Sequence, residues 1–238
     1  MKAVILAAGI SSRMRPLTDH TPKPMLRIVG KPLIEWVVLS LRRGGITNIL
    51  ITTHYLSTVI TDYLGDGAQW GVKIRYTYEP DRLDTAGSLL LARDWIGNSP
   101  FLICGGHFIL PELEVEKFIS FHSQKNGIGT ICFKPYPDTS LLGAFGQGSL
   151  DAESRLVVFK EMPEVTFSNL IHTTYQVYQS SVLDFIPDDG SAYSIPDFLI
   201  PTLLGRSLSI YGYVHFGELI NVSTIELYER AVRLADHG

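Results

Sequence analysis

The sequence predicts an α/β fold built on a doubly wound, mostly parallel sheet with helices on both faces. In residues 1–135, short apolar runs alternate with segments whose apolar residues recur at helical spacing. This βαβ repetition is typical of a parallel sheet covered by helices. From residue 136 on, a turn-rich stretch and several short strand-like runs predict a small β annex near the C-terminus. We expect one domain over residues 1–238, with a core of residues 1–135 and a second half of residues 136–238.

The first predicted strand is KAVILAA, an apolar run that ends at Gly9 and suits a strand buried on both faces. The next strands of the core are expected at NILITT, VKIRYTYE, FLICGG and IGTICFK. The first predicted helix is KPLIEWVVLSLRRGG, whose apolar residues recur at helical spacing before two glycines stop it. Further helices are expected over residues 57–65, 86–97 and 113–127.

In residues 136–238 the predicted strands and helices no longer alternate regularly. Its strand-like runs are expected at residues 155–161, 171–178, 208–216 and 219–222. The run IPDFLIPTLLG predicts a helix, and STIELYERAVRLA predicts an amphipathic closing helix with a Ser/Thr start.

Composition excludes several classes of protein. A hydrophobic fraction of 45% with 18% charged residues is typical of a soluble globular chain rather than a disordered one. The net charge is −4 and basic residues do not cluster, which disfavours a nucleic-acid surface or a membrane patch. No apolar run reaches bilayer length, and the N-terminal run is too short for a signal peptide. Cys104 and Cys132 lie in apolar strand-like runs, so we expect free thiols and a cytoplasmic protein.

The most informative stretch follows the first strand and reads AAGISSRMRPLTDHTPKPMLRIVGKPLIE. Small residues in this loop leave backbone N–H groups free to face phosphate oxygens. Arg13 offers a planar fork of donors to a di- or triphosphate, and Lys23 offers a point charge between two prolines. A surface loop with solvated basic residues is the alternative on these features alone.

The whole string resembles the start of the sugar-1-phosphate nucleotidyltransferases, whose pattern is roughly AAGxGTRLRPLTxxxPKPLxxVxxKPxxE. The likeness continues at LDTAGSL, residues 83–89, against the family's LGTAGAL, and extends more faintly to the C-terminal helix. The resemblance implies a Rossmann-like core that binds a nucleoside triphosphate and a sugar 1-phosphate. The family reaction is in-line attack of the sugar phosphate on the α-phosphorus, which releases pyrophosphate and needs a divalent cation, Mg²⁺.

The resemblance also assigns roles to individual residues. Arg13 would stabilise charge on the triphosphate, and Lys23 would contact the α-phosphate and the incoming sugar phosphate. The nucleotide site would include Ala8, Gly9, Ser11, Ser12, Glu79, Ala86 and Gly87. Ser11 replaces the second glycine of the usual pattern, a mild departure because serine is small.

The sequence departs from the family pattern at the two metal-binding positions. The family holds its cation with two aspartates, one after the glycine that ends the strand FLICGG and one before the last helix. This chain has His107 at the first position and Asn221 at the second. Asparagine can offer an amide oxygen, and histidine ligates transition metals, but hard Mg²⁺ prefers oxygen. We therefore expect altered or impaired Mg²⁺ binding.

The sugar-phosphate side departs as well. The family's Glu-Lys-Pro appears here as Glu161, Met162 and Pro163, so a charged donor has become a thioether. Thr174 stands where the family has glycine at the sugar floor, and its β-branched side chain would narrow a sugar pocket.

Three interpretations of His107 stay open: a ligand for a softer metal, a protonated cation toward phosphate, or a position without chemistry. Two functions stay open with them. One is an enzyme that makes a nucleotide sugar from a nucleoside triphosphate and a sugar 1-phosphate. The other is a catalytically silent relative that binds a nucleotide or nucleotide sugar, or that supports an active partner as a homo- or hetero-dimer.

Overall fold

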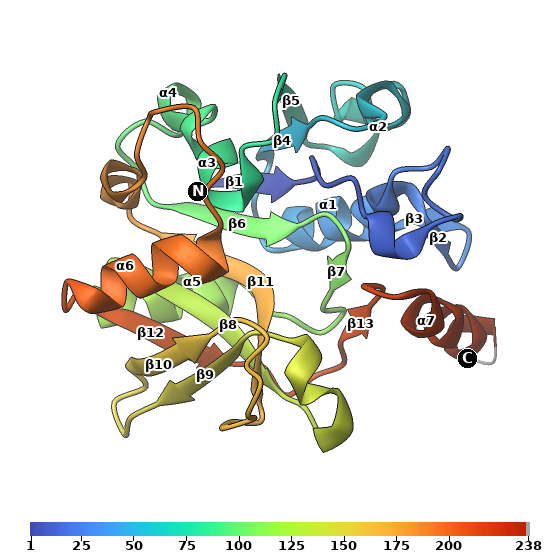
Figure 1. Ribbon diagram of the computed structural model, residues 1–238. Coiled ribbons are helices and arrows are strands. Elements are labelled where there is room, and N and C mark those ends of the chain that lie inside the picture. The colour runs from blue at the N-terminus through green and yellow to red at the C-terminus, as the bar shows by residue number, and fades with distance from the viewer. Residues whose placement is uncertain (237–238) are drawn as a thin grey trace. The chain divides into compact units, whose positions relative to one another are not determined.

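The computed structural model describes residues 1–236, and the chain divides into two compact units made of interleaved segments (Figure 1). Unit 1 consists of Met1 with residues 83–103 and 116–216. Unit 2 consists of residues 2–82 and 104–115 together with the described residues from 217 on. The division expected near residue 135 therefore falls inside unit 1.

Unit 2 contains three parallel strands in the order β1-β4-β5. Their bounds are Lys2–Leu6, Asn48–Thr53 and Lys73–Tyr78. The middle of β1 is fully buried, as expected for an apolar run covered on both faces. The helices of this unit are α1 (Leu33–Arg43) and α2 (Ser57–Leu64), with short helical turns at η1 (Ser12–Met14), η2 (Lys23–Met25) and η3 (Ala68–Trp70).

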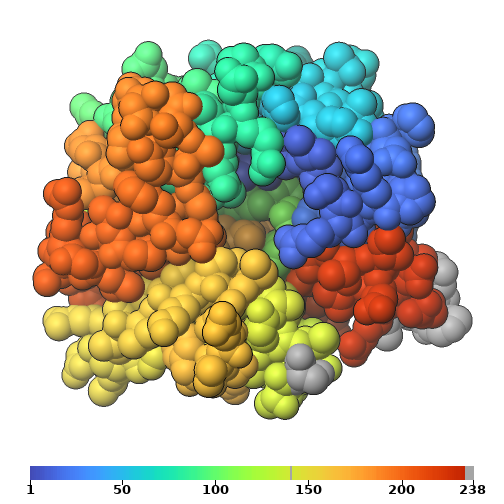
Figure 2. Space-filling view, in the orientation of Figure 1, coloured from blue at the N-terminus to red at the C-terminus, as the bar shows by residue number. Residues whose placement is uncertain are grey.

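Two small ladders and the last helix complete unit 2. A hairpin joins β2 (Arg27–Ile28) to β3 (Lys31–Pro32) through Val29 and Gly30, both left-handed with φ of 51° and 72°. The second ladder pairs β7 (Phe108–Ile109) with β13 (Ile220–Asn221) in antiparallel register. After it comes α7 (Ile225–Asp236), and Figure 2 shows its red surface beside the blue surface of the N-terminal segment. The Tyr228 hydroxyl donates to the Arg27 carbonyl at 2.9 Å across this contact.

Unit 1 is organised around its longest strand, β11 (Leu170–Tyr178), which pairs antiparallel with β6, β8 and β9. The strands around it are β6 (Phe101–Gly105), whose residues 101–103 belong to this unit, β8 (Gly129–Pro135), β9 (Gln147–Leu150), β10 (Leu156–Lys160) and β12 (Ile210–Val214). β10 pairs antiparallel with β9, and β12 pairs parallel with β8. The pairing of β11 with β8 shifts register between His172 and Gln176, so a bulge interrupts the strand there.

One predicted helix of unit 1 is interrupted in the structure, whereas the helix predicted at IPDFLIPTLLG keeps its full span as a π-helical turn followed by an α-helix. The helix expected over residues 86–97 is split into α3 (Asp84–Leu90) and α4 (Arg93–Ile96). Its other helical segments are α5 (Val115–Lys125), η4 (Thr139–Ala144), η5 (Ser180–Phe185), the π-helical η6 (Ile195–Leu199) and α6 (Ile200–Gly205).

The α/β class is confirmed, with strands flanked by helices in the order the sequence predicts. The parallel order is clear in unit 2, whereas antiparallel pairs predominate around β11. Among the described residues, no helix has the length and apolar character needed to cross a bilayer.

Candidate active site

The loop after β1 exposes a row of unused backbone donors. Pairing with β4 continues as far as Ala7, whose N–H donates to the Thr52 carbonyl at 3.2 Å. In the part of the chain that the structure describes, the N–H groups of residues 8–12 donate to no other protein atom. A Cβ added at Gly9 would meet only the Ser11 Oγ, at 4.0 Å, so an incoming group has room to approach the backbone. Free amides in an open loop are the elements of an anion-binding nest.

Ser11 fixes the shape of this loop. It is left-handed, with φ of 56°, and its carbonyl accepts from the Met14 N–H at 2.9 Å and the Thr18 hydroxyl at 3.0 Å. Thr18 is buried, so the turn is anchored from beneath. The carbonyl is thus held by the protein, and the neighbouring amides stay available.

Two cations without counter-ions accompany the loop. Arg13 is exposed in η1, and Lys23 is half-buried in η2 between Pro22 and Pro24. Burial, and secondarily the charge of Arg13, lower the pKa of Lys23 to about 7. Within residues 1–236 neither side chain forms an ion pair with a carboxylate. A desolvated lysine beside an arginine is stabilised when an anion binds.

His107 follows the end of β6 and lies near both cations. The Gly106 N–H donates to the Leu6 carbonyl at 3.0 Å, which places His107 beside the end of β1. A Cβ on Gly106 would lie 3.3 Å from Pro24, so the small residue lets the Lys23 segment approach closely. Burial, then Lys23, then Arg13 lower the pKa of His107 well below its usual value. This pKa shift argues against a protonated His107 acting as a cation at neutral pH.

Asn221 lies in the ladder opposite Phe108, the residue after His107. The residue is only 7% exposed. The Oδ1 atom accepts from the Ser223 N–H at 2.9 Å, whereas Nδ2 has no hydrogen-bond partner among the described residues. Because the Ser223 N–H needs an acceptor, this bond fixes the orientation of the amide.

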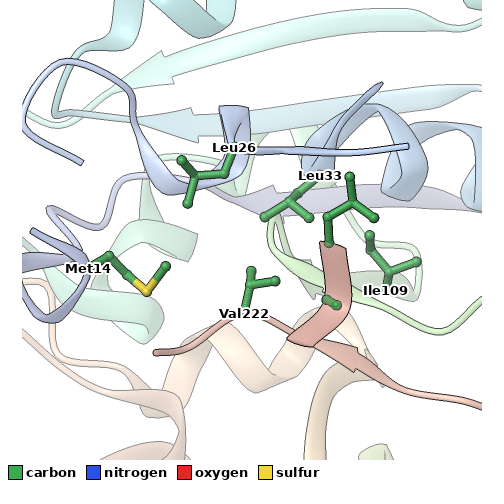
Figure 3. Close-up of a cluster of buried hydrophobic side chains, with 7 residues drawn as sticks. Met14, Leu26, Leu33, Ile109 and Val222 are labelled. Carbon is green, nitrogen blue, oxygen red and sulfur yellow. The ribbon is translucent and has the colours of Figure 1, made fainter. Parts of the chain in front are cut away.

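One hydrophobic cluster holds these segments together (Figure 3). Met14, Leu26, Ile109 and Val222 all belong to it. Each lies within three positions of one site residue: Arg13, Lys23, His107 and Asn221, respectively. The structure therefore brings together four residues from three separate stretches of the chain.

The residues at the expected metal position do not fit Mg²⁺. This ion takes oxygen ligands, usually with at least one carboxylate. His107 supplies nitrogen, and the only side-chain oxygen of Asn221 is engaged by Ser223. The described residues contain no group of three or more His, Cys, Asp or Glu side chains that could hold a metal ion.

The remaining nucleotide-side candidates are held by the protein itself. Glu79 is buried after β5, and its carbonyl contacts the His54 Nδ1 at 2.7 Å. Ala86 and Gly87 lie in α3 of unit 1, and both of their N–H groups donate to the Tyr193 carbonyl, at 2.7 and 3.1 Å. These two amides are thus already engaged within unit 1.

The candidates for the sugar-phosphate side all belong to unit 1. Glu161 packs against Gly146, and Met162 is half exposed, with φ of 38°. Thr174 lies in the β11 bulge with φ of 68°.

The structure adds one residue, His172, that the sequence pattern did not single out. His172 is buried beside Gly146, and its Nε2 has no partner among the described residues. Burial lowers the pKa of His172 to about 4, so the ring is neutral. Its position two residues before Thr174 was the only available signal.

An α/β fold with free amides and unpaired cations after its first strand has the elements of an anion-binding site. The chain belongs to the nucleotidyl transferase family, because residues 2–225 match the profile of that family. This finding confirms the resemblance drawn from the front-end motif.

Individual relatives agree with the family. The chain is 30% identical, over 98% of its length, to a UTP–glucose-1-phosphate uridylyltransferase of Synechocystis, of which it covers 63%. It is 50% identical to an N-acetylmuramate alpha-1-phosphate uridylyltransferase of Neisseria meningitidis, over 44% of this chain and 46% of that protein. A mannose-1-phosphate guanylyltransferase of Mycobacterium tuberculosis is 29% identical over 96% of the chain and 62% of that protein. The chain thus spans less than two thirds of these relatives' own lengths.

Solved structures support the fold. A putative glucose-1-phosphate thymidylyltransferase from Bacillus anthracis superposes with a TM-score of 0.88 at 24% identity, covering 99% of this chain and 95% of that one. HddC from Yersinia pseudotuberculosis, complexed with GMP-PN, gives 0.82 at 21% identity and covers 98% of both chains.

Proposed function

We propose that this protein transfers a nucleotidyl group from a nucleoside triphosphate to a sugar 1-phosphate, forming a nucleotide sugar and pyrophosphate. The observation that carries the proposal is the loop of free amides at residues 8–12 with Arg13 and Lys23 beside it and no carboxylate paired to either cation. Membership of the nucleotidyl transferase family supports the same reaction class.

In this reaction an oxygen of the sugar phosphate attacks the α-phosphorus. The bond from that phosphorus to the bridging oxygen breaks, and pyrophosphate leaves with the electron pair. The chemistry demands positioning of two anions and stabilisation of the charge that moves onto the leaving group. Arg13 faces the leaving pyrophosphate in our proposal, and Lys23 neutralises the α-phosphate and the attacking phosphate. The free amides of residues 8–12 hold the remaining phosphoryl oxygens.

We take UTP and an N-acetylated sugar 1-phosphate as the first substrates to test. Two of the relatives named above are uridylyltransferases, and the segment of 50% identity belongs to one that acts on N-acetylmuramate α-1-phosphate. Our candidates for recognising the sugar are Glu161, Met162, His172 and Thr174. His172 offers an unpartnered neutral ring nitrogen, which can bond to a sugar hydroxyl or amide.

We also propose that the dependence on Mg²⁺ differs from that of ordinary relatives. The support is the donor set at His107 and Asn221, which lacks carboxylates. The same substitutions favour the second candidate function, a silent relative that binds a nucleotide or nucleotide sugar.

A pyrophosphate-release assay across the four nucleoside triphosphates and several sugar 1-phosphates tests the proposal. We expect turnover that falls at least about 100-fold in Arg13→Ala, since one lost charge-stabilising donor typically costs 2–3 orders of magnitude. Arg15→Ala is the matched control, because Arg15 is exposed and forms only a surface ion pair with Asp19 at 3.3 Å.

The two functions give different results. Turnover that Arg15→Ala leaves within about twofold and Arg13→Ala abolishes supports the enzyme. Absent turnover with every substrate pair, together with thermal stabilisation by a nucleotide, establishes the silent binding protein instead.

A further inference from the structure

We propose that His107, Asn221 and Lys23 form a metal-free oxyanion site that donates hydrogen bonds directly to the phosphoryl oxygens of a bound nucleoside triphosphate. The inference rests on the proposed function for the presence of the nucleotide. It goes beyond that function because it replaces a protein-bound cation with hydrogen-bond donors supplied by this chain.

The orientation of the Asn221 amide is the first step. Its oxygen accepts from the Ser223 N–H at 2.9 Å, and its NH₂ group has no partner among residues 1–236. The residue is 7% exposed, and its Nδ2 atom is buried away from bulk water. A buried donor without an acceptor destabilises the protein. An oxyanion at this position would satisfy the donor, whereas a cation would not.

The second step is the neighbourhood of that amide. Asn221 and Phe108 face each other in the antiparallel ladder of β13 and β7. Residues so paired have Cα atoms about 4.5–5.5 Å apart, which places Asn221 next to the His107 segment. The His107 ring packs edge-on against Phe108, with centroids 5.2 Å apart, and makes no hydrogen bond within the described chain. A neutral imidazole carries one N–H donor, which is thus available to a ligand.

The third step is charge. Lys23 and Arg13 both act electrostatically on His107, and neither has a carboxylate partner in the described structure. The cluster of Met14, Leu26, Ile109 and Val222 fixes the four segments relative to one another. The chain therefore presents cations and hydrogen-bond donors at the positions where the family pattern has two aspartates. Such a set attracts phosphate and repels Mg²⁺.

Isothermal titration of the full-length protein with the β,γ-imido analogue of UTP, in EDTA and in excess Mg²⁺, tests the site. We expect the analogue to bind at least as tightly in EDTA, because Mg²⁺ masks the oxygens that the donors would contact. Asn221→Asp replaces a donor with a negative charge of the same shape. We expect it to weaken binding in EDTA at least about tenfold, since hydrogen bonds to charged groups are the stronger ones.

Two variants control for trivial effects. Asn98→Asp adds the same charge at an exposed turn in unit 1, and we expect its affinity to stay within about twofold of wild type. Asn221→Ala removes the donor without adding charge, and it still reports on the site if Asn221→Asp folds poorly. We expect Asn221→Ala also to weaken binding in EDTA.

A metal titration gives a second readout that is independent of nucleotide. Electron paramagnetic resonance follows free Mn²⁺ as protein is added. We expect wild-type protein to leave the signal unchanged, and the double variant His107→Asp with Asn221→Asp to remove signal as it binds the ion.

The outcomes separate this inference from the proposed function. Binding of the analogue only when Mg²⁺ is present, or Mn²⁺ binding by wild-type protein, overturns the metal-free site and leaves nucleotidyl transfer standing. Binding in EDTA that Asn221→Asp and Asn221→Ala both leave unchanged also overturns it. No binding in either condition overturns the proposed function itself, and the inference falls with it.

Discussion

At the scale of single residues, three positions hold a left-handed backbone without the glycine that the family pattern has there. Ser11, Asp84 and Thr174 have φ of 56°, 56° and 68°. A side chain in this conformation brings Cβ close to the backbone and costs about 1–2 kcal/mol. Serine and aspartate tolerate it through local hydrogen bonds, as Asp84 does by accepting from the Thr85 N–H at 2.6 Å. A β-branched residue such as Thr174 tolerates it least.

We therefore predict that Thr174→Gly is at least as stable as wild type, by up to about 1 kcal/mol. Relief of about 1–2 kcal/mol of strain exceeds the entropic cost of glycine, about 0.5–1 kcal/mol. Urea denaturation measures the change. Thr173→Gly is the control, because Thr173 is fully buried and its hydroxyl donates to the Cys132 carbonyl at 2.8 Å. We expect the control to lose about 2 kcal/mol or more. Equal losses in both variants would mean that Thr174 is not strained.

At the scale of elements, the sequence predicts the long, periodic strands and helices better than it predicts the two-residue strands. The strand at NILITT has the predicted bounds, Asn48–Thr53, because a continuous apolar run is a strong signal. The strands β2, β3 and β7 have two residues each, too few for any period to be visible, whereas the equally short β13 lies within the strand predicted at residues 219–222. The helix expected over residues 86–97 breaks at Leu91 and Ala92, although no glycine or proline marks that point.

The candidate site divides in the same way. The motif at residues 7–35 predicted Arg13 and Lys23 as site residues. Differences from the family pattern pointed to His107 and Asn221. The orientation of the Asn221 amide could not be predicted, because it depends on one backbone N–H, that of Ser223. The unpartnered Nε2 of His172 likewise depends on burial among residues from other strands, such as Phe159.

The cluster around Met14 links packing to binding. Met14 is 1% exposed, and it directly follows Arg13. We predict that Met14→Ala lowers the free energy of unfolding by about 2–5 kcal/mol, since it leaves a cavity. Because the cavity lies under the cationic loop, we also expect nucleotide affinity to fall at least about tenfold.

Ile60→Ala is the matched control for this prediction. Ile60 is fully buried in α2 of the same unit, and it is outside the cluster. We expect a comparable loss of stability with affinity within about twofold of wild type. Calorimetric titration with nucleotide, at a temperature where both variants are folded, measures the difference. If both variants lose affinity equally, the cluster has no special role in placing Arg13.

At the scale of the whole molecule, the two proposed sets of binding residues do not correspond to two consecutive stretches of the chain. The residues proposed to bind phosphate, from Ala8 to Lys23 with His107 and Asn221, all belong to unit 2. Those proposed to read the sugar belong to unit 1. Yet each unit is assembled from separated stretches of chain, and the chain passes from one unit to the other near residues 82, 103, 115 and 216. The division that we expect within the single domain, at residues 1–135 and 136–238, does not coincide with the bounds of these units.

This interleaving predicts the behaviour of a fragment containing residues 1–135. The fragment retains β1, β4 and β5, and it keeps Arg13, Lys23 and His107. It lacks β13 and α7, whose Val222 and Ala231 complete the hydrophobic cluster, and it lacks β11, the central strand of unit 1. The free energy lost with several buried apolar side chains exceeds the free energy of unfolding of a typical domain, about 5–15 kcal/mol. We expect no cooperative urea transition by circular dichroism and no nucleotide binding, whereas the full chain shows both. A sharp transition in the fragment, with nucleotide affinity retained, would instead establish residues 1–135 as a domain in their own right.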